Sequence, residues 1–211
     1  MSATRQFYGR WARLYDWLAT APGVRSWRQR AVEALDLEPG DVAVEMGYGS
    51  GANLPYLRRA VGPAGTVVGV DLTRAMLLAG RDRGGHLVQG DATRPPVAGP
   101  VDGLLGTFVV GMFDDPGAVV QRWCDLVTPG GRVALLHFTR SERRWTRPLN
   151  AVYRAFVWAS SAGKPVRNVA GDHDRRVRQA GEALAARTVD AREETFAAGY
   201  LRLVDGRVPG D

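Results

Sequence analysis

The stretch Val42-Ala-Val-Glu-Met-Gly-Tyr-Gly-Ser-Gly51 decides the fold of this chain of 211 residues. It is an apolar run that ends at an acidic residue, Glu45, and is followed by glycines at alternate positions. A second apolar run, residues 66–70, ends at Asp71, twenty residues after the last of these glycines. A strand, a glycine turn, a helix and a second strand ending in a carboxylate are typical of a nucleoside-binding half-site.

The spacing of the glycines distinguishes between ligands. A dinucleotide fingerprint reads G-x-G-x-x-G, whereas Gly47, Gly49 and Gly51 are each separated by a single residue. A Walker-type phosphate loop is excluded, because no Gly-Lys-Ser/Thr follows and the one lysine of the chain is Lys164. Glycines allow a ligand to approach the backbone closely, and the Asp71 carboxylate can accept hydrogen bonds from both hydroxyls of a ribose.

Strand and helix patterns alternate along most of the chain. This alternation predicts right-handed crossovers and a mostly parallel sheet with helices on both faces, with ligands at the carboxyl ends of the strands. We expect seven strands, the last antiparallel, in a single domain. The expected strands are 42–46, 66–70, 86–89, 103–107, 132–136, 188–195 and 200–205. The expected helices are 5–19, 26–37, 53–60, 74–82, 116–126, 147–160 and 173–186, with caps at Thr73 and Asp115.

Further motifs follow in order. They are Leu87-Val-Gln-Gly-Asp91-Ala92, the segment 102–116, and Leu126-Val-Thr-Pro-Gly-Gly131. Together with the glycine run, they resemble the motifs of class I S-adenosylmethionine-dependent methyltransferases over residues 5–138. The resemblance implies a Rossmann-like fold and S-adenosylmethionine as the cofactor. It also implies these cofactor-binding residues: Glu45, Gly47, Tyr48, Gly49, Gly51, Asn53, Asp71, Leu72, Asp91, Ala92, Thr107 and Phe108.

The resemblance divides the chain into four parts. Residues 1–38 are expected to form a helical lid, 42–138 the cofactor-binding core, 139–187 a basic cover on the acceptor side, and 188–211 the last strands. Within the superfamily, Phe7-Tyr-Gly-Arg-Trp-Ala-Arg-Leu-Tyr-Asp16 resembles the entry segment of two groups. These groups are the ubiquinone and menaquinone C-methyltransferases and the bacterial phosphatidylethanolamine N-methyltransferases, and the sequence leaves both open.

Two side chains are candidates for roles in the reaction. An amine acceptor, a phenol or a quinol carbon must lose a proton, and His137 is expected at the carboxyl end of a central strand, where a base would act. The alternative for His137 is a loop histidine bonded to the backbone. The resemblance places Tyr15 in the entry helix over the cofactor, where the alternative is that it only packs.

The composition of the chain indicates where the protein is located and whether it binds a metal. Apolar residues make up 45% of the chain, and no run approaches the roughly 20 residues that span a bilayer. The polar N-terminus lacks the apolar stretch of a leader, so we expect a cytoplasmic protein. The one cysteine, Cys124, excludes an internal disulfide and a zinc cluster, and we expect no metal.

The net charge of +6 is concentrated in one segment. Residues 139–187 hold ten arginines and one lysine against four acids, so they carry +7 and the rest about −1. Arginines next to Trp145, Tyr153, Phe156 and Trp158 suit peripheral contact with an anionic membrane at its inner face. They equally suit a solvated helix face. The motifs of DNA-base methyltransferases are absent and no RNA-binding module is recognised, so the sequence disfavours nucleic acid as a partner.

The sequence therefore predicts methyl transfer from S-adenosylmethionine to a small acceptor. A hydrophobic or amphipathic acceptor, either a quinol precursor or a phospholipid amine, is favoured. Two alternatives stay open: a methyltransferase for a soluble polar metabolite, and a non-catalytic protein that binds the cofactor.

Overall fold

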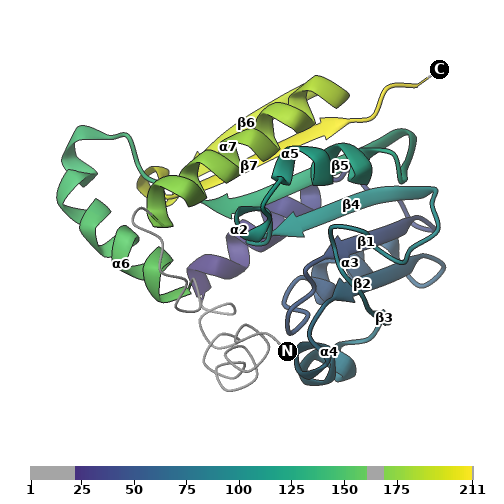
Figure 1. Cartoon of the computed structure of the whole chain (residues 1–211). Helices are drawn as coiled ribbons and strands as arrows, with labels where there is room; N and C mark the ends of the chain where they lie inside the picture. The colour runs from purple at the N-terminus through teal and green to yellow at the C-terminus, as the bar shows by residue number, and fades with distance from the viewer. Residues whose placement is uncertain (1–21, 161–168, 211) are drawn as a thin grey trace.

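The computed structural model describes residues 22–160 and 169–210, and within them a seven-stranded sheet forms the centre of the molecule (Figure 1). The strand order is β3-β2-β1-β4-β5-β7-β6. Strand β7 is antiparallel to both of its neighbours, and the other neighbouring pairs are parallel. The predicted sheet with an antiparallel last strand is confirmed. The strands are β1 (Val42–Met46), β2 (Thr66–Asp71), β3 (His86–Gln89), β4 (Val101–Thr107), β5 (Val127–Phe138), β6 (Val189–Phe196) and β7 (Leu201–Arg207).

Helices cover both faces of the sheet and bury a hydrophobic cluster on each. On one face pack α5 (Pro116–Cys124) and α7 (Val169–Arg187). On the other pack α2 (Pro22–Glu33) and α3 (Leu54–Val61). Figure 1 shows α6 beyond the carboxyl end of β5. The remaining helical elements are α4 (Arg74–Gly80), α6 (Asn150–Ser160), and the 3₁₀ turns η1 (Arg81–Arg83), η2 (Val110–Met112), η3 (Arg144–Leu149) and η4 (Ala197–Gly199).

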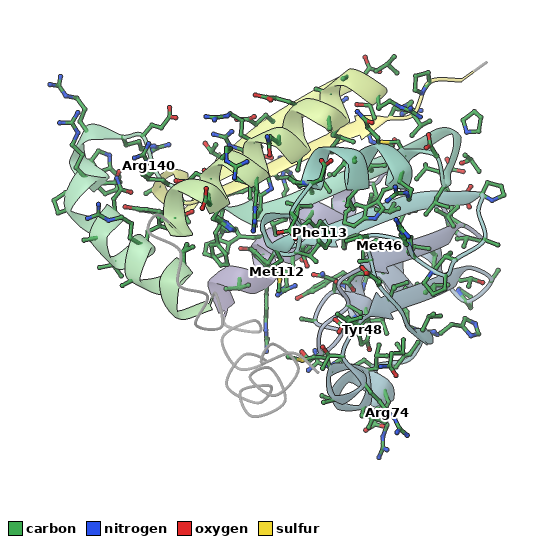
Figure 2. All side chains as sticks on the ribbon, viewed as in Figure 1. Met46, Tyr48, Arg74, Met112, Phe113 and Arg140 are labelled. Atoms are coloured by element: carbon green, nitrogen blue, oxygen red, sulfur yellow. The ribbon has the colours of Figure 1, made fainter. Side chains whose placement is uncertain are left out.

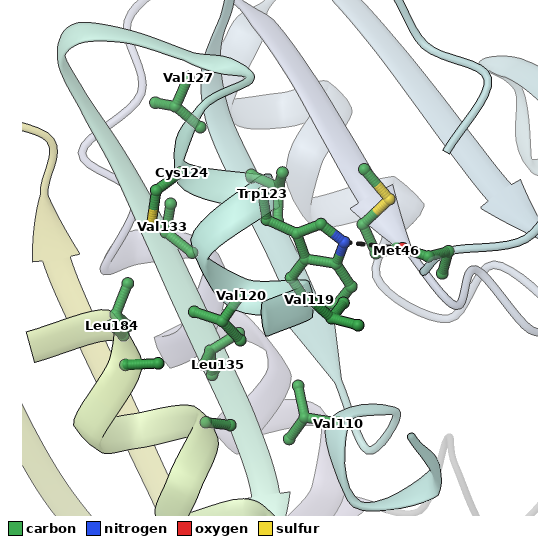
Figure 3. Close-up of a cluster of buried hydrophobic side chains, with 14 of the residues drawn as sticks. Met46, Val110, Val119, Val120, Trp123, Cys124, Val127, Val133, Leu135 and Leu184 are labelled. Carbon is green, nitrogen blue, oxygen red and sulfur yellow. Dashed lines mark hydrogen bonds between the residues drawn. The ribbon is translucent and has the colours of Figure 1, made fainter. Parts of the chain in front are cut away.

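Trp123 organises the cluster under α5 and α7 (Figure 3). Its indole is fully buried, and its Nε1 donates a hydrogen bond to the Ala92 carbonyl at 2.8 Å, which joins α5 to the loop after β3. Gly106 on β4 makes room for the ring, because a Cβ there would lie 2.8 Å from it. The burial of a large indole with its polar atom satisfied stabilises the fold by several kcal/mol, and truncating such a side chain to alanine costs about 3–5 kcal/mol.

A buried ion pair fixes the antiparallel strand. Arg132 on β5 donates a hydrogen bond to the Asp205 carboxylate on β7, and both side chains are buried. The Arg132 Nε also donates to the Ala34 carbonyl, 2.9 Å away, after the end of α2. One guanidinium therefore holds two strands and the segment that follows α2, and it leaves neither charge without a partner.

Several predicted boundaries were wrong, each for a local reason. The helix expected at 26–37 is α2, which ends at Glu33, and Asp36 then adopts φ 53°. The helix expected from Arg147 begins at Asn150, because Pro148 lies within a 3₁₀ turn. Asp115 caps α5 as predicted, with its Oδ1 3.0 Å from the Ala118 nitrogen, whereas the Thr73 side chain makes no cap bond.

The helix predicted at 5–19 lies outside the described residues. In the two described ranges, no helix combines the length and apolar character that crossing a membrane requires.

Candidate functional site

The glycine turn lies at the carboxyl end of β1, where a ligand would meet the sheet. Gly47, Gly49 and Gly51 all have positive φ, at 74°, 58° and 78°, a region that other residues adopt at a cost. A Cβ on Gly49 would meet nothing closer than the Gly47 carbonyl at 3.9 Å, so the space beside it is open. The turn thus combines a backbone that requires glycine with room for a ligand.

Tyr48 supports this turn from beneath. Its ring is buried, and its hydroxyl donates a hydrogen bond to the Gly80 carbonyl at the end of α4, at 2.8 Å. Figure 2 shows Tyr48 beside α4, the helix that begins at Arg74. Burial raises the Tyr48 pKa to about 12, so the phenol keeps its proton at neutral pH. Its hydroxyl anchors the loop, and its predicted contact with a cofactor stays a prediction.

Asp71 is held at the end of β2 by backbone amides. Its Oδ2 accepts a hydrogen bond from the Gly49 nitrogen at 2.8 Å, and its Oδ1 accepts one from the Thr73 nitrogen at 2.7 Å. Desolvation raises the Asp71 pKa, and the two amide bonds oppose that rise. Each carboxylate oxygen has a further lone pair, so Asp71 is oriented and can still accept two ligand hydroxyls.

Glu45 is a buried carboxylate with one oxygen unsatisfied. Its Oε1 accepts a hydrogen bond from the Asn53 amide, and among the described residues its Oε2 has no hydrogen-bond partner. Desolvation raises the Glu45 pKa to about 7. A buried carboxylate oxygen of this kind is unfavourable unless a cation or a donor meets it, so the site favours a positively charged ligand group.

Arg28 on α2 completes the polar end of the site, and it was not predicted from the sequence. Its guanidinium is buried, and its Nη1 lies 3.0 Å from the Asn53 Oδ1 and 3.4 Å from the Thr107 Oγ1. Its Cζ lies 5.1 Å from the centre of the Phe108 ring, a cation–π contact. A small pocket opens beside it. Its lining residues are Arg28, Gly47, Tyr48, Gly49, Ser50, Ala52 and Thr107.

The remaining predicted cofactor residues lie at the ends of β2, β3 and β4. Leu72, directly after β2, is exposed. Asp91, directly after β3, is also exposed, and its Oδ1 accepts a hydrogen bond from the Thr93 nitrogen at 2.8 Å. Phe108, after β4, stacks on Phe138 with ring centres 4.5 Å apart and adopts φ 59°. A positive φ in an aromatic residue is strained, and such strain is frequent at functional sites.

Of the two residues predicted to take part in the reaction, His137 and Tyr15, only His137 lies within the described residues. His137 is buried on β5, and neither ring nitrogen has a hydrogen-bond partner among the described residues. Desolvation lowers its pKa to about 3, with smaller contributions from Arg202 and His173. His137 is therefore neutral at physiological pH and a weak base. Tyr15 lies outside the described residues.

The donors and acceptors of the site fit S-adenosylmethionine. At one end Glu45 offers an acceptor for an ammonium, and Arg28 offers donors for a carboxylate. At the end of the neighbouring strand β2, the oriented Asp71 carboxylate suits a ribose. The buried Glu45 carboxylate opposes the binding of a pyrophosphate at this end, in agreement with the glycine spacing.

Comparisons with known proteins agree with this geometry. Residues 44–135 match the sequence family described as a methyltransferase domain. A 2-phytyl-1,4-naphtoquinone methyltransferase from Thermosynechococcus vestitus is 35% identical over 123 residues, which are 55% of this chain and 54% of that protein. A demethylmenaquinone methyltransferase from Corynebacterium kroppenstedtii is 32% identical over 114 residues, 54% of this chain and 48% of that protein. The chain spans about half the length of the curated relatives it matches.

Solved structures show the same fold. A SAM-dependent methyltransferase from Thermotoga maritima matches with a TM-score of 0.67 and 16% identity, covering 97% of this chain and 99% of that one. One from Aquifex aeolicus matches with a TM-score of 0.60 and 16% identity, covering 86% and 89%.

Sheet order and site define a class I, Rossmann-like domain of the kind that uses S-adenosylmethionine. Residues 44–135 are similar to a methyltransferase domain, and the chain resembles proteins of the ubiquinone and menaquinone methyltransferase group.

Proposed function

We propose that this protein transfers a methyl group from S-adenosylmethionine to a small hydrophobic or amphipathic acceptor. One observation carries the proposal: at the carboxyl end of β1, Asn53 bridges a buried carboxylate that has an unsatisfied oxygen, Glu45, and a buried guanidinium, Arg28. This pair matches the opposite charges of an amino acid group, and it lies beside a glycine turn and an oriented ribose acceptor.

Each polar residue then has one task. Glu45 accepts a hydrogen bond from the cofactor ammonium through Oε2, and Arg28 donates to the cofactor carboxylate. Asp71 accepts from the ribose hydroxyls. Asp91 and the Ala92 amide bind the adenine. Charge-assisted bonds of this kind are shorter and stronger than neutral ones, which gives the buried end most of the specificity.

The protein contributes alignment and shielding to the reaction. The bound cofactor supplies an electrophilic methyl group on a sulfonium. An in-line displacement needs the acceptor held opposite the leaving sulfur and water kept away, with few acid–base groups. The stacked rings of Phe108 and Phe138 form an apolar wall at the ends of β4 and β5, beside Arg28. This wall suits an acceptor with a flat or apolar body.

A quinol precursor is the acceptor we favour. Several relatives that match this chain at 32–35% identity are named as naphthoquinone or menaquinone methyltransferases. A phospholipid amine is the alternative, because the run Gly49-Ser-Gly-Ala-Asn-Leu-Pro55 resembles the phosphatidylethanolamine N-methyltransferases. Both acceptors are amphipathic.

A base role for His137 stays a prediction, and its low pKa opposes it because proton uptake at a buried, unpaired imidazole is unfavourable. The change His137→Gln separates the possibilities, with His86→Gln on the exposed start of β3 as the control. Loss of turnover with unchanged cofactor binding would support a base. Unchanged turnover would assign His137 to packing.

The proposal is tested with methyl-labelled S-adenosylmethionine, the purified protein and a total extract of the source cells, partitioned between organic and aqueous phases. Label in the organic phase is the expected result. Label only in the aqueous phase would indicate a polar metabolite or a macromolecule as the acceptor. Cofactor binding without any transfer would favour the non-catalytic alternative.

A further inference from the structure

The segment between β5 and α7 presents apolar side chains to solvent. Trp145 and Leu149 on η3 are 64% and 49% exposed, and Val152 on α6 is 66% exposed. Leu149 and Val152 are three residues apart across the junction of η3 and α6, so they lie on the same side of the η3–α6 unit, and Trp145 precedes them on η3. Large exposed apolar residues gathered in one short segment mark an interaction surface more often than chance exposure does.

This exposure is a fixed property of the fold. Thr146, between the exposed residues, is fully buried and accepts the Tyr200 hydroxyl through its carbonyl at 3.0 Å. Tyr153 on α6 is buried, and its hydroxyl donates to Asp174 on α7 at 2.7 Å. The inner side of the unit is thus bonded to α7 and to the η4–β7 end. Trp145, Leu149 and Val152 are held outward by that packing.

The same segment carries a strong positive charge. Residues 139–160 contain five arginines and a single acid, Glu142. Arg143, Arg144, Arg147 and Arg154 are exposed, and within the described ranges none of them forms an ion pair. Arg140, at the start of the segment in Figure 2, is 3.9 Å from Asp174. Unpaired arginines therefore surround the apolar residues.

We propose that the η3–α6 surface, residues 140–154, docks on an anionic lipid bilayer. Tryptophan and aliphatic side chains enter the boundary between headgroups and acyl chains, while arginines stay at the headgroup level and meet the lipid charge. A second copy of the chain fits less well, since a two-fold interface would bring the same arginines together. Nucleic acid fits less well too, because Trp145 is the one exposed ring among these three apolar residues, and Leu149 and Val152 offer no flat surface on which a further base could stack.

Docking on lipid would deepen the proposed function, because it would explain how the protein reaches an amphipathic acceptor. That explanation rests on the proposed function, whereas vesicle binding itself does not. Figure 1 places α6 beyond the carboxyl end of β5, the end of the sheet at which the cofactor site lies. Docking there would bring that end of the sheet to the lipid surface, where an amphipathic acceptor dissolves. Vesicle binding by the surface requires no turnover, so the two proposals fail separately.

The test is sedimentation of the full chain with vesicles of phosphatidylcholine alone or mixed with phosphatidylglycerol, at low and high salt. We expect binding to the anionic vesicles at least about tenfold tighter than to the neutral ones, and weaker binding at high salt. The double change Leu149→Ser and Val152→Ser should reduce binding about tenfold or more, and so should Arg143→Ser with Arg147→Ser. Matched controls are Leu78→Ser on α4, where the side chain is 50% exposed, and Arg59→Ser on α3.

Circular dichroism and S-adenosylhomocysteine binding on each variant establish that fold and cofactor site are intact. Equal binding to both vesicle types, no binding to either, or control variants as defective as the test variants would overturn the proposal. Light scattering that shows a dimer which the Leu149 and Val152 changes dissociate would assign the surface to self-association instead. Salt-sensitive binding to a random RNA without vesicle binding would assign it to nucleic acid.

Discussion

The two ends of the candidate cofactor site are built in opposite ways. At the β1 end, Glu45, Arg28 and Asn53 are buried, and the Asn53 amide is hydrogen-bonded to both Glu45 and Arg28. At the β2–β3 end, Asp71 and Asp91 are held by backbone amides, and Asp91 is exposed. Buried charges bind strongly when matched and are costly when unmatched, whereas an exposed carboxylate competes with water. We therefore expect the β1 end to determine affinity and the other end to contribute less.

The largest effect should come from Arg28→Met. This change removes the donor for the cofactor carboxylate and leaves Glu45 without its nearby positive charge. We expect cofactor affinity to fall by roughly 3–5 kcal/mol, which calorimetry would measure. The control is Arg30→Met on the same helix, whose ion pair with Glu194 is exposed and contributes little. Equal losses of cofactor affinity in Arg28→Met and Arg30→Met would contradict the conclusion that the β1 end determines affinity.

The pH dependence of Glu45 is the next effect. Its folded pKa of about 7 lies above the ordinary value of 4.5, so the neutral form favours folding. That stability is fully present below about pH 4.5 and is lost as the pH rises through about 7, a loss of about 3 kcal/mol. Urea unfolding at a series of pH values would show a decline in the wild type that Glu45→Gln lacks.

Cofactor affinity should depend on pH in the opposite direction to folding stability. The ammonium of the cofactor favours the ionised Glu45, so affinity should rise with pH up to about 7 and then level off. Calorimetry across this range in two buffers would also show proton release on binding. A flat affinity profile in the wild type would contradict the assignment of Glu45 to the ammonium.

The change Asp71→Ala tests the β2–β3 end of the site. It removes two ribose hydrogen bonds and an acceptor for the Gly49 and Thr73 amides, so we expect cofactor affinity to fall by about 1–3 kcal/mol. Asp71→Asn keeps one carbonyl acceptor and should lose less. A folded Asp71→Ala protein with unchanged affinity would sink the assignment of this half-site.

The smallest effect should come from Asp91→Ala. The side chain is exposed and already bonded to the Thr93 amide, so its loss should cost less than about 1 kcal/mol of cofactor affinity. Adenosine and S-adenosylhomocysteine should lose affinity equally if Asp91 acts on the adenine. A loss as large as that of Arg28→Met would mean that affinity is spread evenly across the site.

The contrast between the two ends of the site also explains which parts of the structure could be predicted from the sequence. The glycine turn, Asp71 and the Asp115 cap each act over a few residues, so their spacing alone indicated them. Arg28 acts on partners 25 and 79 residues away, Asn53 and Thr107, and no local pattern marks a lone arginine on α2. Leu149 and Val152 fall within the helix expected at 147–160, but Pro148 places the start of that range in η3, and both residues are exposed. Only the contacts of α6 with α7 decide which side is buried.

The sheet order has a consequence for synthesis. Strand β7 follows β6 in the chain but lies between β5 and β6 in the sheet. As the polypeptide leaves the ribosome, β6 therefore has no strand to pair with until residues 201–207 emerge. Arg132, already among apolar neighbours, has no counter-charge until Asp205 arrives. The five strands β1 to β5 can assemble early, while the β7–β6 edge of the sheet is completed only when β7 inserts.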